Sequence, residues 1–271
     1  MNGIDAARAR PVVESQGEGP RVRASSRFAA LLQGLAVQAG FNYRGFQNLG
    51  FAAMMLPALR DLYPEPERLR AALHRHLDYF NTHPHVAGVA AGALMRDEQR
   101  RARGEAGALD DEAQVRLRRA LGSLLGSIGD RLIWAGLMPL AVLAGLLAWF
   151  YEPLWGAPVV LVLFNLPQLA LRADGLRLGW EEGPEVYRRV GGPAAARLLL
   201  WARRMAALTA GALAVLLVLH PLTPSGTEGV ALVAVGAALA LLFRRLRLPP
   251  ALSGTLVAAL IGLYCLFTAA A

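Results

Sequence analysis

The sequence predicts an all-α, polytopic membrane protein with re-entrant or broken segments and an amphipathic helical region before its first span. Three observations support this fold class. Of the 271 residues, 55% are hydrophobic. Several segments lack formal charge for about the 20 residues that cross a bilayer, and Gly and Pro separate stretches with helical apolar spacing. The uncharged segments are residues 132–151, 153–171, 205–222, 229–243 and 251–271.

These patterns divide the chain into three parts. Residues 1–27 are rich in Arg, Ser and Gly without an apolar core, which predicts a disordered cytoplasmic tail and excludes a secretory signal peptide. Residues 28–119 form the amphipathic or re-entrant helical region, and residues 120–271 the transmembrane region with about five hydrophobic segments.

Charge is distributed between the hydrophobic segments. All 28 basic residues are Arg, and they form no single patch, so the net charge of +8 does not favour a nucleic-acid partner. Arginines precede the first span and fill the second and fourth connectors, whereas residues 152–153 and 223–228 have none. The positive-inside bias therefore predicts a cytoplasmic N-terminus and an external C-terminus. The single cysteine, Cys265, permits no internal disulfide.

The first helical stretch lies within residues 27–60, with a break at Gly40. Gln47 and Asn48 interrupt its apolar pattern, and a buried primary amide must find hydrogen-bond partners. A helix cap or an interhelical hydrogen bond explains both residues, and a binding role remains the alternative.

A second amphipathic helix is predicted from Pro66 to Phe80. Pro suits a first helical turn, Asn81 and Thr82 are expected to end the helix, and Pro84 opposes its continuation.

Four histidines lie within twelve residues of this stretch, at positions 74, 76, 83 and 85. No two stand at the i, i+4 spacing typical of a helical zinc site, so the pattern does not favour a metal. A hydrolase elbow of the Gly-x-Ser-x-Gly type is absent, and without Lys the phosphate-binding Gly-Lys motif is excluded.

Residues 86–95 are apolar and rich in Gly and Ala, too short to span alone, and are expected to form a closely packed hairpin or re-entrant helix. Residues 97–119 carry alternating blocks of acidic and basic side chains and are expected to form a charged helix and linker with a solvated face.

Glycines then precede an acidic residue at the predicted membrane edge. Gly126 and Gly129 permit an unwound or tightly packed backbone, and Asp130 follows them. An ionisable group there suggests a functional site, with an ion pair to Arg131 or to another arginine at the cytoplasmic edge as the structural alternative.

Two features lie in the region after the first span. Pro158, Asn165 and Pro167 make residues 153–171 a candidate broken or re-entrant segment that lines protein or water. The adjacent carboxylates at positions 181 and 182 point apart on a helix, so they do not form a paired acid/base site.

The block His-Leu-x-x-Phe-Asn-Thr-x-Pro at residues 76–84 is the most specific pattern in the chain. Together with residues 42–51 and the glycine blocks at 128–134 and 179–183, it resembles the IID membrane subunit of the mannose/fructose/sorbose family of sugar phosphotransferase systems. The resemblance runs from about residue 41 to the C-terminus.

The resemblance implies a non-catalytic permease subunit of the bacterial inner membrane. Such a subunit pairs with a IIC membrane subunit, assembles into a higher oligomer and takes up a hexose, while cytoplasmic IIA and IIB components relay phosphate from phosphoenolpyruvate. Phosphorylated histidines belong to IIA and IIB in that family, so this chain is expected to carry no phosphoryl group and no cofactor.

Within this framework, Gln47, Asn81 and Asp130 are expected to bind or line the path of the sugar, because amides and carboxylates suit hydroxyl groups. His76 is expected to orient the turn at Asn81. The supporting positions are His76, Thr82, Gly129 and Asn48.

Some positions depart from the family pattern. Residues 44–46 replace an acidic-basic-Met run, Leu124 and Ser127 stand where Pro and Gly are usual, and Arg131 replaces a small residue. A transport-inactive paralogue with a regulatory or scaffolding role is therefore the alternative, and an unrelated membrane protein whose small residues serve only packing is a third hypothesis.

Overall fold

The computed structural model describes residues 19–193 and 196–202, with residues 204–205, 207–208, 211, 234, 238, 242 and 245. Within these residues every regular element is helical, and only isolated bridges join Phe46 to Asn42 and Phe80. The predicted apolar segments at 205–222, 229–243 and 251–271 lie mostly or wholly outside the described residues.

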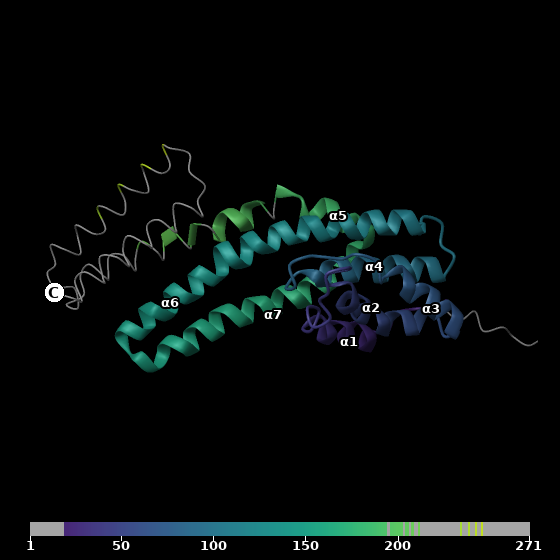
Figure 1. Ribbon diagram of the computed structural model, residues 1–271, viewed down its shortest axis with the longest axis horizontal. Helices are drawn as coiled ribbons and strands as arrows, with labels where there is room; N and C mark the ends of the chain where they lie inside the picture. The colour runs from purple at the N-terminus through teal and green to yellow at the C-terminus, as the bar shows by residue number, and fades with distance from the viewer. Residues whose placement is uncertain are drawn as a thin grey trace, which may run out of the picture. The chain divides into compact units, whose positions relative to one another are not determined.

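The chain forms two compact units, Met1–Met138 with Leu161–Arg203, and Pro139–Val160 with Arg204–Ala271. The first unit opens with four helices that pack together (Figure 1). They are α1 (Ala24–Gly34), α2 (Asn48–Leu62), α3 (Pro66–Arg75) and α4 (Ala87–Ala102). Helix α1 therefore begins inside the stretch assigned to the tail.

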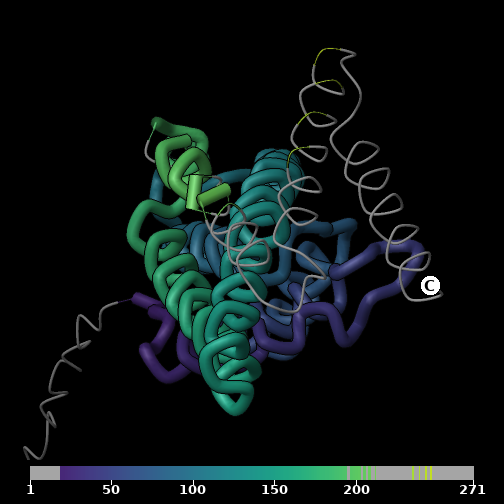
Figure 2. The backbone as a smooth tube through the Cα atoms, turned by 90° about the vertical axis from the view of Figure 1, so that its left-hand side faces the viewer, coloured from purple at the N-terminus to yellow at the C-terminus, as the bar shows by residue number. Residues whose placement is uncertain are grey.

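Helix α4 packs on α1, α2 and α5, and Figure 1 shows it between α5 and the α1–α2 pair. Figure 2 shows the same backbone turned by 90°. The small residues of α4 also admit α7: a Cβ on Gly92 would lie 2.3 Å from the Leu176 carbonyl oxygen, and one on Gly179 would lie 2.1 Å from that of Val89. Close packing was predicted for residues 86–95, but they begin a 16-residue helix that protein surrounds from Ala87 to Met95. The predicted close packing is therefore observed, and the segment is part of one continuous helix and not a hairpin.

The solvated face expected from residue 97 onwards is also wrong at its beginning. Asp97 and Glu98 are each 0% exposed and Gln99 is 4% exposed. Their partners come from other elements, so the alternation of charges along the sequence did not reveal their burial.

Two helical runs, Asp111–Tyr151 and Pro153–Val190, are long and apolar enough to cross a membrane. The first comprises α5 (Asp111–Gly129), the π-helical stretch η1 (Asp130–Leu137) and α6 (Met138–Tyr151). The second comprises the 3₁₀ turn η2 (Pro153–Trp155), α7 (Gly156–Glu182), the 3₁₀ turn η3 (Gly183–Glu185) and α8 (Val186–Val190).

Helix α7 is continuous through Pro167, so the predicted break within residues 153–171 is absent from it. Asn165 donates to the Leu161 carbonyl of its own helix, at 2.8 Å. The carboxylates of Glu181 and Glu182 point to different partners, Arg177 and Arg189, as their adjacency predicted.

Candidate functional site

The motif segment, residues 76–86, connects α3 to α4 without regular structure. The helix predicted to reach Phe80 ends at Arg75. Phe80 pairs instead with the start of α2: its N–H donates to the Gly45 carbonyl at 3.2 Å, and its carbonyl accepts from the Gln47 N–H at 2.9 Å. The centroid of its ring lies 4.0 Å from that of the Phe51 ring. Burying this ring and forming two backbone hydrogen bonds stabilise the chain more than continuing α3 as a helix to Phe80 would.

Gln47 holds the motif segment in place. Its Nε2 donates to the Thr82 carbonyl at 2.8 Å, and its Oε1 accepts from the Thr82 N–H at 3.1 Å. Asn48 acts similarly, donating to the Leu77 carbonyl at 2.6 Å and accepting from Asn42 at 2.9 Å. Both amides thus form hydrogen bonds between separate segments of the chain, as the structural alternative to a binding role predicted.

The glycines of α5 let the motif segment lie directly on that helix. A Cβ on Gly122 would lie 2.9 Å from the Asn81 carbonyl oxygen, and one on Gly129 would lie 2.2 Å from the Cβ of His83. Of the two alternatives for this glycine stretch, the tightly packed backbone is the one observed.

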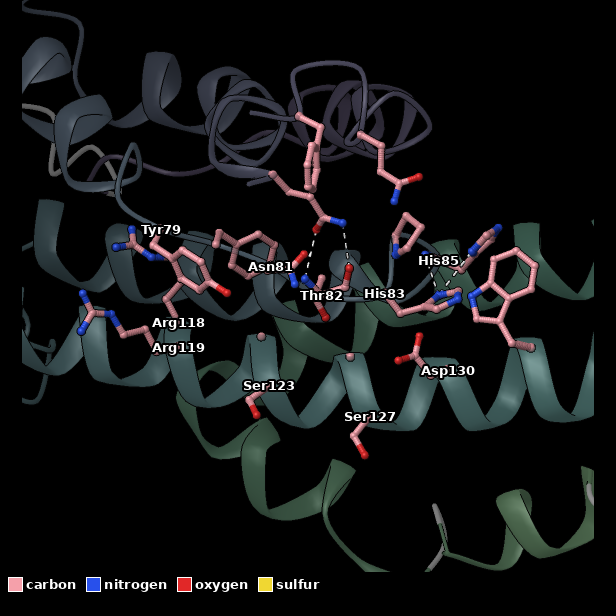
Figure 3. Close-up of a pocket in the computed structure, with 18 residues that line it drawn as sticks. Tyr79, Asn81, Thr82, His83, His85, Arg118, Arg119, Ser123, Ser127 and Asp130 are labelled. Atoms are coloured by element: carbon pink, nitrogen blue, oxygen red, sulfur yellow. Dashed lines mark hydrogen bonds between the residues drawn. The ribbon is translucent and has the colours of Figure 1, made fainter. Parts of the chain in front are cut away.

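The loop pocket, about 760 Å³ in volume, lies between the motif segment and α5–η1 (Figure 3). All three residues predicted to bind sugar, Gln47, Asn81 and Asp130, line it, although they are far apart in sequence. Gln47 is 2% exposed with both polar ends bonded to Thr82. Asn81 and Asp130 are exposed, and neither side chain has a hydrogen bond or ion pair within the described part of the chain.

The two ends of the loop pocket differ in charge. Arg118 and Arg119 lie at one end, and Asp130 lies beside His83 at the other (Figure 3). Arg118 is 2% exposed and donates to the Arg75 carbonyl at the end of α3. Sequence reasoning did not select the arginines, because no local pattern separates them from the other arginines of the chain.

Arg131 does not neutralise Asp130. Its Nε donates to the Ser127 carbonyl at 3.1 Å and its guanidinium also reaches the Ser127 hydroxyl at 2.5 Å. The ion pair proposed as the structural alternative for Asp130 is therefore not formed. Asp130 begins the π-helical stretch, a distortion that is frequent at functional sites.

His83 and His85 form the wall near Asp130, with their Nδ1 atoms 3.3 Å apart. Burial lowers the pKa of His83, and the charge of Asp130 only partly offsets this effect. Burial, followed by the charge of Arg172, lowers the pKa of His85 to about 4. Both imidazoles are therefore neutral near pH 7. Arg172 also donates to the Pro84 carbonyl at 3.0 Å, which ties the motif segment to α7.

His76, expected to orient the turn at Asn81, belongs to a buried group that we call the Glu98 cluster. The Glu98 carboxylate accepts from Tyr63 at 2.6 Å, Arg75 at 2.9 Å and His76 Nε2 at 3.0 Å. Burial alone would raise the pKa of Glu98, but the hydrogen bonds and charges of His76 and Arg75 hold it at about 2. The cluster fixes the end of α3 to α4, and His76 does not line the loop pocket.

Residues 21–260 match the family described as EIID-AGA, the PTS system mannose/fructose/sorbose family IID component. The chain belongs to this family. Its resemblance to the mannose-family IID subunit and its all-α membrane fold are thereby confirmed. The protein is a membrane component of a phosphotransferase system.

Among curated relatives, the mannose-specific EIID component of Escherichia coli K12 is 35% identical over 156 residues, 57% of this chain and 54% of the relative. The sorbose-specific EIID component of Klebsiella pneumoniae is 35% identical over 155 residues, 57% of this chain and 56% of the relative. The matched part thus spans about half the length of these relatives.

A solved chain from the cryoEM structure of the mannose transporter ManYZ with microcin E492 aligns with a TM-score of 0.58 and 27% identity, over 92% of this chain and 98% of that chain. A second, described as a membrane protein, aligns with a TM-score of 0.68 and 27% identity, over 90% and 97%.

Proposed function

We propose that this IID component binds a hexose and moves it across the bacterial inner membrane together with a IIC subunit, in a higher oligomer coupled to phosphorylation by IIA and IIB. The observation that carries the proposal is the loop pocket, in which Asn81 and Asp130 present unpaired polar groups from two distant parts of the chain. The relatives named for mannose and sorbose support a hexose as the ligand.

The chemistry of the pocket suits a sugar. A carboxylate accepts hydrogen bonds from hydroxyl groups, and a primary amide both donates and accepts them. Trp134 also lines the pocket and supplies an aromatic surface against which the C–H groups of a sugar ring pack. We assign Asn81 and Asp130 to the sugar itself.

The other predicted residues support these two. Gln47 supports the sugar site indirectly, because its amide forms two hydrogen bonds with the backbone of Thr82, next to Asn81. Gly129 admits His83, Asn48 fastens the Leu77 carbonyl, and His76 joins the Glu98 cluster. The chain itself carries no phosphoryl group in this proposal, and its N-terminus is cytoplasmic and its C-terminus external.

The test is phosphoenolpyruvate-dependent sugar phosphorylation by membranes that contain this chain, its IIC partner and the IIA and IIB components. Asn81→Ala and Asp130→Ala should each abolish most of the activity while the IIC subunit still co-purifies. The control is Arg116→Gln, because Arg116 is exposed on α5, pairs with Glu112 and does not line the pocket. Unchanged phosphorylation in both pocket variants, with assembly intact, would refute the proposal.

A second candidate function is a scaffolding or regulatory subunit that binds IIC without transport. Two departures from the family pattern, Ser127 and Arg131, bond to each other, and Ser127 lines the pocket. Co-purification of IIC without any sugar phosphorylation by the unmodified chain would favour this candidate.

A further inference from the structure

His83 carries a buried polar atom that the packing of the motif segment leaves unused. Its side chain is 3% exposed and lines the loop pocket, yet its Nε2 has no hydrogen-bond partner within the described part of the chain. Thr82 Oγ1 and Arg118 Nε, on two other residues that line the pocket, are also buried without a hydrogen-bond partner in the described part of the chain, although the Arg118 guanidinium pairs with Asp78. Buried polar groups are normally bonded, so several unpaired ones at one pocket indicate a polar ligand.

The other ring nitrogen determines which hydrogen bond Nε2 can make. His83 Nδ1 lies 3.4 Å from the backbone N–H of His85, which can only donate, and 3.3 Å from His85 Nδ1. Nδ1 is therefore the acceptor, and a neutral imidazole then carries its proton on Nε2. Burial, which lowers the pKa of His83, keeps the ring neutral near pH 7.

Packing explains the position of the His83 ring, but it does not explain why Nε2 is buried without a hydrogen-bond partner. Gly129 admits the Cβ of His83, and the Trp134 ring lies edge-on with its centroid 6.0 Å from that of His83. The charged and titratable groups around the imidazole are Asp130 from η1, His85 from the motif segment and Arg172 from α7.

We propose that His83 contacts the sugar, with its Nε2–H donating a hydrogen bond to a hydroxyl oxygen beside the Asp130 carboxylate. The inference rests on the proposed function, because it requires a hexose in the loop pocket. Asp130 accepts from a hydroxyl and His83 donates to one, so together they select a particular arrangement of two hydroxyl groups.

His76 offers an internal comparison. Its Nδ1 is also buried and without a partner in the described part of the chain, but it lies in the Glu98 cluster, away from the loop pocket. His83 differs because its unpaired nitrogen belongs to a residue that lines the pocket beside Asp130 (Figure 3).

The test uses two variants in the purified complex with IIC, titrated separately with mannose, fructose and sorbose. His83→Asn places an amide near the position of Nδ1 and removes the donor at Nε2. His83→Gln reaches farther and keeps an N–H donor near Nε2. The Asn variant should bind the preferred sugar roughly tenfold more weakly, the change expected for one lost hydrogen bond, whereas the Gln variant should stay near wild type.

Monodeoxy analogues of the preferred sugar separate contact from structure. The analogue that lacks the hydroxyl oxygen bound by His83 should bind the wild type about tenfold more weakly than the parent sugar does, and the Asn variant should show no further loss for it. A second readout needs no variant: ¹⁵N-labelled histidine should show a protonated Nε2 on His83 whose signal shifts when sugar is added.

The outcomes are distinguishable. A wild-type complex that binds none of the three sugars overturns the proposed function, and this inference with it. A wild type that binds sugar, with an Asn variant of equal affinity or an unshifted His83 Nε2 signal, overturns the inference alone.

Discussion

Two polar groups include residues of the motif segment, and they differ in how completely their hydrogen bonds are satisfied. In the Glu98 cluster, the buried carboxylate has donors on both oxygens. In the loop pocket, the side chains of Asn81 and Asp130 and the Nε2 atom of His83 have no hydrogen-bond partner within the described residues. The first arrangement stabilises the fold, whereas the second leaves bonds available to a ligand.

The largest expected effect is the loss of the Glu98 carboxylate. Glu98→Ala leaves Arg75 and His76 without their buried acceptor, and breaking one side of a buried ion pair costs about 3–5 kcal/mol. Thermal and denaturant unfolding of the purified protein measure this loss. Glu112→Gln, at an exposed pair, should change stability by less than about 0.5 kcal/mol. An equal effect of both substitutions would contradict the role of the cluster.

Acid should remove the same contribution. The folded pKa of Glu98, about 2, lies below its usual 4.5, so the unfolded state takes up the proton first as the pH falls. The contribution is complete above about pH 4.5, decreases between about pH 4.5 and 2, and amounts to about 3 kcal/mol. Unfolding free energies measured against pH for wild type and Glu98→Gln should converge over this range, and parallel curves would contradict the account.

The next effect belongs to Gln47, which joins the two regions. Gln47→Leu leaves the Thr82 N–H and carbonyl without their hydrogen-bond partners, which costs about 1–3 kcal/mol of stability. The substitution also removes the contacts that hold the motif segment beside Asn81. We expect a lower melting temperature and a higher KM for sugar in the phosphorylation assay. Gln47→Glu keeps an acceptor for Thr82 N–H and should be the milder variant; a normal KM in the Leu variant would show that the clamp does not position Asn81.

These contacts show what the sequence could and could not predict. The uncharged apolar segments predicted the long helices, because composition and spacing are sufficient to recognise a segment long enough to cross a bilayer. Gln47, Asn81 and Asp130 were chosen as site residues because of the family resemblance, and all three line the loop pocket. Their local sequence alone does not predict that they lie together. The end of α3 was missed because its determinants are distant: Arg118 caps Arg75 from α5, and Phe80 pairs with the chain before α2. Glu98 was missed because its partners come from the distant ends of α2 and α3.

The smallest expected effect on stability comes from the loop pocket. Asp130→Asn removes an exposed carboxylate with no ion pair in the described part of the chain, so the ligand-free unfolding free energy should change by less than about 0.5 kcal/mol. Sugar phosphorylation should nevertheless fall by at least about tenfold, since a charge-assisted hydrogen bond to the sugar is lost. A large loss of stability without loss of phosphorylation would place Asp130 with the structural residues.

The most direct test compares the melting temperature of the IIC-bound complex with and without saturating sugar, in wild type and in Asp130→Asn. A ligand at 100 times its Kd stabilises the folded state by about 2.7 kcal/mol. The account predicts that sugar raises the melting temperature of the wild type, while the variant melts normally without sugar and gains much less from it. An equal sugar-induced rise in both proteins would contradict the assignment of the unpaired pocket groups to the ligand.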